Sequence, residues 1–310
     1  MARKTAKSAE DYIVPLLMND LQGRMLRMPP PRGKYREIML VYGHHASLER
    51  MFGLAEELNR YGGVTMPDLP GFGGMESFYK IKEKPTLDNL ADYLAAFVKL
   101  RYRNRRLTVV AMSFGFMVVT RMLQKYPELA KRVDLLISIV GSVHSGDIRF
   151  RRHNYLLLRW AASLFSRRLP SALAARLALR GPFIRLAYRL VEDRHSKLKD
   201  GTKRQRRQRI AFEVRLWQCN DFRTYAETGL SLLTKQLTDH HVALPVLHVY
   251  SKNDRYYDDL RVEQHMRQVF SDFQAHPIRL PAHAPTVIAS AKEAAPYIPP
   301  KIRALLRKKP

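Results

Sequence analysis

A serine between small residues is the first candidate for chemistry in this sequence. Ser113 lies in the segment Ala111-Met-Ser-Phe-Gly115, with a small residue two positions before it and two positions after it. Where a buried strand turns sharply into a helix, the residue at the turn adopts strained dihedral angles, and small neighbours avoid clashes. The pattern therefore predicts an accessible, nucleophilic hydroxyl at Ser113. Backbone N–H groups at the start of the following helix would stabilise a developing oxyanion.

A candidate base and a candidate acid follow further along the chain. A serine hydroxyl is a weak nucleophile until a base removes its proton. His283, just past the last predicted strand, is the candidate base, and Asp254, directly after the preceding strand, is the carboxylate that would orient it. Three other carboxylates are alternatives to Asp254: Asp258 and Asp259 in the same loop, and Asp147 after an earlier strand.

The elements that must position these residues alternate along the chain from residue 35 onward. Strand-like runs are predicted at 37–42, 64–66, 106–112, 133–140, 245–250 and 274–280. Helical spacing is predicted at 48–61, 87–101, 114–126, 260–270 and from residue 291. This alternation predicts an α/β fold, with a mostly parallel sheet flanked by helices. Ser113 lies where one strand passes directly into a helix.

Three regions differ from one another in pattern. The alternating core covers residues 35–142 and 241–310. Between them, residues 143–240 show only helical patterns and are strongly basic, which predicts an inserted helical cap or lid. Residues 1–34 are interpreted as an N-terminal helical extension, because the spacing of apolar residues over 11–27 suits an amphipathic helix.

The balance of charge is unusual. The chain carries 54 Lys and Arg against 28 Asp and Glu, a formal net charge of +26. Such a charge attracts polyanions, although basic residues spread over a whole chain are also a common bias without function. Within the cap, 150–168 interleaves leucines and Trp160 with arginines. This segment predicts either contact with an acidic membrane surface or, as the favoured interpretation, packing over the active site.

Several classes of site are not expected. The lone Cys219 forms no intramolecular disulfide, and the absence of an uninterrupted apolar run argues against a signal peptide or a spanning helix. A cytoplasmic location is the resulting expectation. His44 and His45 are adjacent, so that their side chains would point to opposite faces of an extended segment, and no metal site is predicted there. The turn 71–74 lacks the lysine of a phosphate loop, and no cofactor is expected.

These features resemble the α/β-hydrolase superfamily, in its serine-nucleophile, esterase-like or lipase-like branch with a helical cap, over about residues 35–304. The segment 43–45, Gly-His-His, resembles the oxyanion loop of that family. The turn-rich segment 67–73 resembles its loop after the fourth strand. The chain order of the three catalytic candidates also agrees with the family: Ser113, Asp254 and His283.

The resemblance implies an oxyanion hole formed by the backbone N–H groups of Phe114 and His44. Two positions depart from the family pattern. Tyr42 stands where a histidine usually precedes the loop glycine, which bears on how the loop is anchored, and Ala111 replaces the first glycine of the elbow. Neither departure removes a catalytic group.

The expected reaction is a two-step acyl transfer on a carboxylic ester, without a cofactor. Thioesterase, aminopeptidase and carbon–carbon bond hydrolase activities share this triad and stay open as alternatives. Serine at the elbow argues against dehalogenases and epoxide hydrolases of the fold, which use aspartate. Arginines of the cap would select an anionic or lipid-like acyl substrate: Arg151, Arg152 and Arg159.

A second class of function is a non-catalytic protein that docks acidic lipid or nucleic acid through the basic cap. The complete set of triad residues argues against that interpretation. Peripheral contact with an acidic membrane is compatible with either class, and nucleic acid is not expected as a partner.

Overall fold

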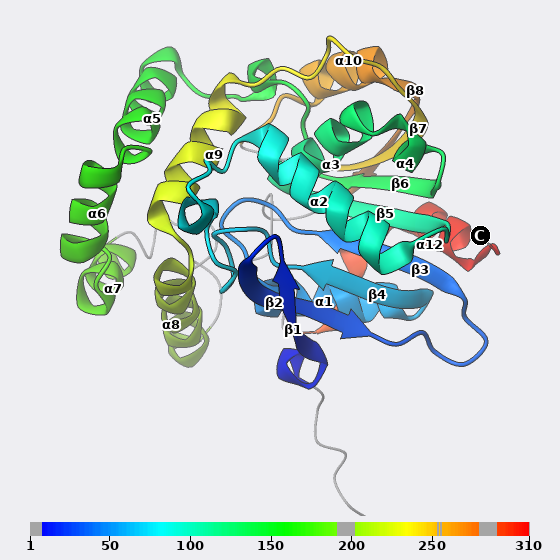
Figure 1. The fold of residues 1–310 in the computed structure, drawn as a ribbon, viewed down its shortest axis with the longest axis horizontal. Helices are drawn as coiled ribbons and strands as arrows, with labels where there is room; N and C mark the ends of the chain where they lie inside the picture. The colour runs from blue at the N-terminus through cyan, green and yellow to red at the C-terminus, as the bar shows by residue number, and fades with distance from the viewer. Residues whose placement is uncertain (1–7, 191–201, 253, 255, 279–289, 310) are drawn as a thin grey trace, which may run out of the picture.

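The computed structural model describes residues 8–190, 202–252, 254, 256–278 and 290–309. These residues form one eight-stranded sheet in the order β1-β2-β4-β3-β5-β6-β7-β8 (Figure 1). Its strands are β1 Ile13–Met18, β2 Leu21–Met28, β3 Arg36–Val41, β4 Gly62–Pro67, β5 Leu107–Met112, β6 Val133–Ile139, β7 Val242–Ser251 and β8 Phe270–Ile278. Neighbouring strands from β4 to β8 run parallel, and β1 and β2 pair antiparallel.

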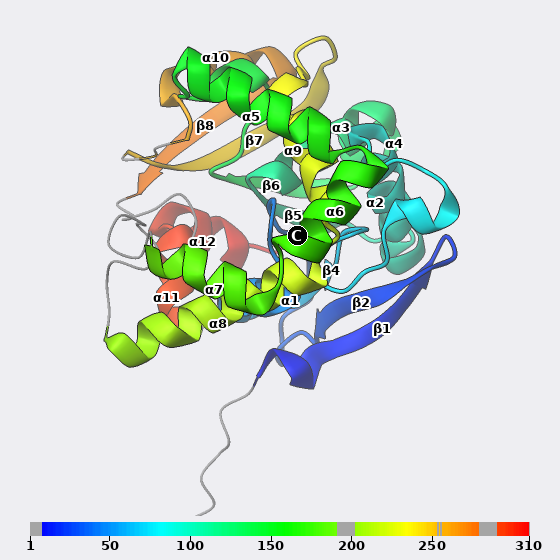
Figure 2. The same ribbon diagram turned by 90° about the vertical axis from the view of Figure 1, so that its left-hand side faces the viewer.

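Helices cover both faces of the sheet. One face carries α2, α3 and α4, and the other carries α1, α11 and α12 (Figures 1 and 2). The helices of the core are α1 Leu48–Asn59, α2 Leu87–Tyr102, α3 Phe114–Lys125, α4 Pro127–Ala130, α10 Asp259–Val269, α11 Ala291–Ala294 and α12 Pro300–Arg307. This arrangement confirms the predicted mostly parallel sheet between layers of helices.

Burial on both faces explains the composition of the central strands. All six residues of β5 are buried, and its sequence Leu-Thr-Val-Val-Ala-Met has two adjacent β-branched valines. Strands covered on both sides form continuous apolar runs rather than alternating ones, and β-branched side chains pack well there. The helix α3 begins immediately after the residue that follows β5, so the chain reverses direction at Ser113.

The N-terminal region differs from the prediction. The amphipathic helix expected over 11–27 is wrong, because β1 and β2 form an antiparallel hairpin there. Asn19 and Asp20 connect the strands, and both have positive φ, 50° and 60°. A two-residue turn with positive φ at both positions matches the twist of a hairpin, and asparagine and aspartate tolerate it. Pro15 is accommodated because β1 is the edge strand of the sheet.

The insertion between β6 and β7 is helical, as predicted (Figure 2). Its helices are α5 Arg152–Phe165, α6 Arg168–Leu177, α7 Gly181–Leu190, α8 Lys203–Cys219 and α9 Phe222–Thr234. The ends of the insertion meet at a β-bridge between His144 and Gln236. None of the described helices is long and apolar enough to span a bilayer.

Candidate active site

Ser113 is the single residue that links β5 to α3, and its backbone is strained. Its φ is +48° and its ψ is −122°, in a region that residues with a side chain rarely adopt. The backbone N–H of Ser113 donates to the carbonyl of Ile139 at 3.0 Å, which fixes the turn against the end of β6. The side chain of Ser113 is partly exposed. This is the geometry that the small-x-Ser-x-Gly pattern predicts.

Close backbone contacts explain the small residues around Ser113. A Cβ atom at Gly115 would lie 2.2 Å from the carbonyl oxygen of Tyr42, so that α3 can cross β3 closely only with glycine there. A Cβ atom at Gly43 would lie 3.0 Å from the Cβ of Ser113. Ala111 is fully buried in β5 and pairs with neighbours in β3 and β6. The predicted elbow and oxyanion loop therefore lie against each other.

A tyrosine that the sequence did not single out contacts the candidate nucleophile. Tyr257 is buried, and its phenol forms a hydrogen bond with Ser113. Burial raises the pKa of Tyr257 above its ordinary value, and the hydrogen bond to Ser113 opposes that shift. The nearby carboxylates of Asp254 and Asp147 raise the pKa further. The position of Tyr257 two residues before the start of α10 carries no distinctive sequence signal.

Asp254 is a buried carboxylate three residues after the end of β7. Its side chain is 6% exposed, and its Oδ1 accepts a hydrogen bond from the N–H of Tyr256 at 2.8 Å. The backbone N–H of Asp254 donates to the carbonyl of Ser251 at 2.9 Å, which closes a tight turn. Because β5, β6 and β7 run parallel, Ser113 and Asp254, which follow the carboxyl ends of β5 and β7, lie at the same edge of the sheet.

The other three carboxylates have different surroundings. Asp258 is the N-cap of α10 and accepts from the N–H groups of its first turn. Asp259 is partly exposed, and burial together with Asp254 raises its pKa to about 6. Asp147 is fully buried and lies 2.5 Å from His265, with its second oxygen accepting from Ser142 at 2.7 Å.

Asp147 belongs to a cluster that fastens the loop after β6 to α10. The rings of His144 and His265 stack at 3.9 Å, and their nitrogens and the Asp147 carboxylate lie within 4.8 Å of one another. Nδ1 of His144 already accepts from the N–H of Gly146 at 2.8 Å. Burial lowers the pKa of His144, and the neighbouring His265 lowers it further. These contacts are sufficient to explain the cluster as a structural one.

The predicted oxyanion loop is held by the cap. Nε2 of His44 lies 3.0 Å from both the carbonyl oxygen of Tyr225 and the hydroxyl of Thr228, on α9. Burial lowers the pKa of His44 to about 4, so the imidazole is neutral and can donate to the carbonyl. His45, with φ +56°, packs against Trp217 of α8, with the two ring centroids 4.2 Å apart. Two cap helices, α8 and α9, therefore hold this loop in place.

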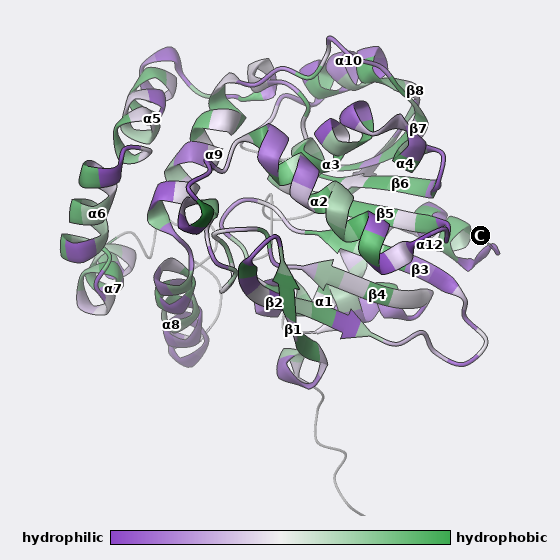
Figure 3. Cartoon of the chain, viewed as in Figure 1, coloured by the Kyte–Doolittle hydropathy of each residue, from purple (hydrophilic) through white to green (hydrophobic). Residues whose placement is uncertain are grey.

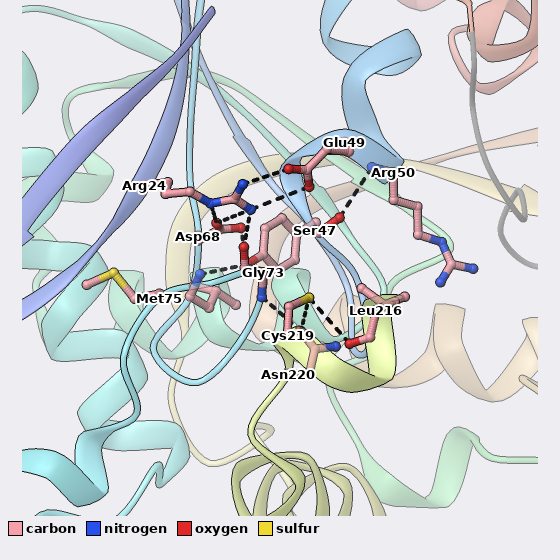
Figure 4. A network of polar contacts seen from close by, with 12 residues as sticks. Arg24, Ser47, Glu49, Arg50, Asp68, Gly73, Met75, Leu216, Cys219 and Asn220 are labelled. Atoms are coloured by element: carbon pink, nitrogen blue, oxygen red, sulfur yellow. Dashed lines mark hydrogen bonds and ion pairs between the residues drawn. The ribbon is translucent and has the colours of Figure 1, made fainter. Parts of the chain in front are cut away.

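Tyr42 anchors the same loop to the loop after β4. Its hydroxyl donates to Asp68 at 2.9 Å and accepts from the N–H of Leu69 at 2.8 Å. Arg24 of β2 forms ion pairs with Asp68 at 3.1 Å and Glu49 at 2.7 Å, and it also donates to the carbonyl oxygen of Gly73 (Figure 4). Burial raises the pKa of Asp68 to about 7. The tyrosine in place of the expected histidine thus ties the loops after β3 and β4 together.

The remaining candidates are partly placed. Phe114 is the first residue of α3, and the first N–H groups of a helix have no partner within it, so this N–H is available for an oxyanion. His283 lies outside the described residues. The structure brings Ser113, the elbow residues and the oxyanion loop into contact and places Asp254 at the same edge of the sheet, while the place of the predicted base is not described.

Comparisons with known proteins identify the family and the fold of the chain. Residues 34–284 match the family described as "Serine aminopeptidase, S33". Cfl2 from Burkholderia cenocepacia superposes with a TM-score of 0.66 at 15% identity, covering 95% of each chain. A thermophilic esterase from Thermogutta terrifontis gives 0.58 at 18% identity, covering 92% of this chain and 94% of its own.

A third solved structure, the epoxide hydrolase CorEH, gives a TM-score of 0.63 at 15% identity and covers 95% of this chain and 98% of its own. No curated protein sequence matches the chain significantly. At such identities the solved structures share the fold, and the match over residues 34–284 defines the family.

Proposed function

Because the chain belongs to the serine aminopeptidase S33 family of α/β-hydrolases, we propose that it is a serine hydrolase that cleaves a carboxylic ester. The observation that carries this proposal is the strained Ser113 at the β5–α3 turn, packed against the loop after β3. Strain of this kind persists only where the surrounding structure imposes it, and it exposes the hydroxyl beside helix N–H groups.

The proposed reaction has two acyl-transfer steps. The hydroxyl oxygen of Ser113 attacks the ester carbonyl while His283 accepts its proton and Asp254 orients the histidine. The N–H groups of Phe114 and His44 stabilise the oxyanion. The histidine then protonates the departing alcohol, which leaves an acyl-serine. Water, deprotonated by His283, releases the carboxylic acid and restores Ser113.

Tyr257 is proposed as a positioning residue in this reaction. Because burial raises the pKa of its phenol, the group stays protonated at neutral pH and cannot take the proton of Ser113. Its hydrogen bond instead restricts the rotamer of the serine hydroxyl before substrate binds. A serine held in one rotamer loses less entropy when it reaches the carbonyl carbon.

An ester, rather than a peptide with a free amino group, fits the charges around the site. Carboxylates are strong hydrogen-bond partners for an ammonium group. Residues 148–190 contain no aspartate or glutamate. Glu213 of the inner cap already lies 3.5 Å from His45 and 3.8 Å from Arg50. The positive cap therefore favours a neutral or anionic acyl substrate over a cationic one.

The test is hydrolysis of p-nitrophenyl esters by the purified chain and by three single variants. Ser113→Ala and His283→Ala are each expected to lower kcat by about a thousandfold or more, and Asp254→Asn by a smaller factor, since triad members act as a unit. Matched neutral and anionic acyl chains report the substrate class. Undiminished turnover by a folded Ser113→Ala variant would contradict the mechanism.

A further inference from the structure

The outer helices of the cap expose an unusual amount of apolar surface. Of the fifteen large hydrophobic side chains that are exposed among the described residues, ten lie on α5, α6 and α7. On α5 they include Leu157 and Trp160, which are 62% and 64% exposed. Single exposed leucines are ordinary, but a concentration of them on consecutive helices marks an interaction surface.

The exposed side chains follow helical spacing. On α6, Leu169, Leu173 and Leu177 lie four residues apart and form one stripe. On α7, Phe183, Leu186 and Leu190 recur at intervals of three and four. Side chains at such spacing share one face of a helix. The helices α6 and α7 therefore each present a continuous apolar stripe to solvent, and α5 adds the exposed leucines at 156–158 and Trp160.

The fold already accounts for the other face of these helices. Ile184 of α7 is buried against Ile210 and Val214 of α8, and the Tyr188 hydroxyl lies within 3.3 Å of Glu213. On α5, the hydroxyl of Tyr155 donates to the carbonyl of Leu233 on α9. The exposed stripes are thus additional to the faces that hold the cap together.

Arginines accompany the stripes, and acidic residues do not. Residues 148–190 contain ten arginines, no lysine and no aspartate or glutamate. Arg149 lies 3.6 Å from Asp258, and no other of these arginines forms an ion pair with an acidic residue in the described part of the chain. The hydropathy colouring shows hydrophobic and hydrophilic residues alternating along α5, α6 and α7 (Figure 3).

The three helices lie on one side of the molecule. They follow one another along the outer edge of the cap, with α9 between α5 and the sheet (Figures 1 and 2). Because α5 and α6 pack on α9, their exposed stripes face away from the core. We name the exposed side chains of α5, α6 and α7 the outer cap surface.

We propose that the outer cap surface docks on a bilayer that contains anionic lipid. Leucine, phenylalanine and tryptophan side chains enter the interface between headgroups and acyl chains, and the arginines beside them pair with lipid phosphates. Nucleic acid would match the arginines but leave the apolar stripes in water. A second copy of the chain would bring two sets of arginines together without acidic partners. The bilayer is the occupant that satisfies both kinds of side chain.

Vesicle co-sedimentation tests the proposal without reference to catalysis. The purified chain is mixed with phosphatidylcholine vesicles, with or without about one third phosphatidylglycerol, and we expect partitioning about tenfold stronger onto the anionic vesicles. The triple variant Leu157→Ser, Leu173→Ser, Leu186→Ser should weaken that partitioning by about tenfold or more. Its matched control, Leu17→Ser, Leu100→Ser, Leu260→Ser, changes leucines of equal or greater exposure elsewhere and should leave partitioning unchanged.

Trp160 provides a direct reporter of insertion. Addition of anionic vesicles should shift tryptophan emission to shorter wavelength, and Trp160→Phe should abolish the shift while Trp217 continues to fluoresce. A charge variant, Arg152→Gln, Arg159→Gln, Arg176→Gln, should weaken binding and reduce its salt dependence. Circular dichroism and thermal unfolding establish that each variant is folded.

Several results would overturn the proposal. These are equal partitioning onto neutral and anionic vesicles, no partitioning at all, or an equal loss in the cap variant and its control. Binding of a single-stranded RNA that survives the three leucine changes, without vesicle binding, would instead assign the arginines to nucleic acid. Loss of vesicle binding with unchanged hydrolysis of a soluble ester separates this proposal from the proposed function.

Discussion

The two layers of the cap have opposite relations to the rest of the molecule. The inner helices α8 and α9 hold the loops after β3 and β4: Nε2 of His44 lies 3.0 Å from a carbonyl of α9, and the N–H of Gly73 donates to Asn220 at the end of α8. The outer helices α5, α6 and α7 pack against α8 and α9 on one face and leave the other face exposed and basic. One insertion therefore combines a layer that contacts the loops around Ser113 with a layer whose outer apolar side chains are exposed.

The largest expected effect contrasts a glycine of the elbow, Gly115 on α3, with a glycine of the inner cap, Gly229 on α9. Gly115→Ala should destabilise the protein by about 4 kcal/mol or more, because the new Cβ would lie 2.2 Å from the backbone oxygen of Tyr42, which has no room to move. Gly229→Ala on α9 meets only the His44 ring at 3.8 Å and should stabilise by up to about 1 kcal/mol. Urea unfolding measures both, and equal effects would contradict the contrast.

An intermediate effect concerns pH and the loop held by α9. The pKa of His44 is about 4 in the folded protein, below its ordinary value of 6.5, because burial disfavours the charged imidazole. The unfolded chain therefore binds a proton first as pH falls. The contribution of neutral His44 to the free energy of unfolding is fully present above pH 6.5 and is lost as the pH falls toward 4. This loss amounts to about 2 to 3 kcal/mol.

His44→Gln isolates that contribution. The amide can still donate to the carbonyl of Tyr225 but does not titrate, so the difference in unfolding free energy between wild type and variant should narrow between pH 6.5 and 4. His248, whose pKa burial lowers to about 3, is present in both proteins and cancels. A difference that stays constant over this range would show that His44 is not buried in its neutral form.

The smallest effects compare two residues of one helix. Ile184→Ala should destabilise the protein by about 2 kcal/mol, because Ile184 packs between α7 and α8. Leu186→Ser, two residues along and 55% exposed, should change stability by less than about 0.5 kcal/mol. Thermal unfolding of both variants tests whether the exposed face of α7 contributes to the stability of the fold. A large loss in Leu186→Ser would place that face within the fold.

The sequence was sufficient for the core because its signals are local. Apolar, β-branched runs identified the central strands, and the spacing around Ser113 identified the elbow, since both arise from the backbone within a few residues. The apolar spacing over 11–27 predicts a helix where β1 and β2 form a hairpin, because a short two-stranded ribbon has similar spacing; Asn19 and Asp20 are the only local signal for the turn.

Contacts between distant segments were beyond sequence reasoning. Asp68 accepts hydrogen bonds from Tyr42, which is 26 positions earlier in the chain, and from Arg24, which is 44 positions earlier. Tyr257 reaches Ser113 from a different loop. Such pairs depend on how parallel strands align their ends, and no periodicity encodes them. The role of His283 stays a prediction, since it lies outside the described residues.

The most direct test of the central claim is covalent labelling by a fluorophosphonate probe, with the modified residue located by peptide mass spectrometry. The probe reacts with a serine whose hydroxyl is activated by a neighbouring base. We expect a single adduct on Ser113, abolished in Ser113→Ala and strongly reduced in His283→Ala. A folded wild-type protein without an adduct, or with an adduct on another serine, would contradict the account of the site.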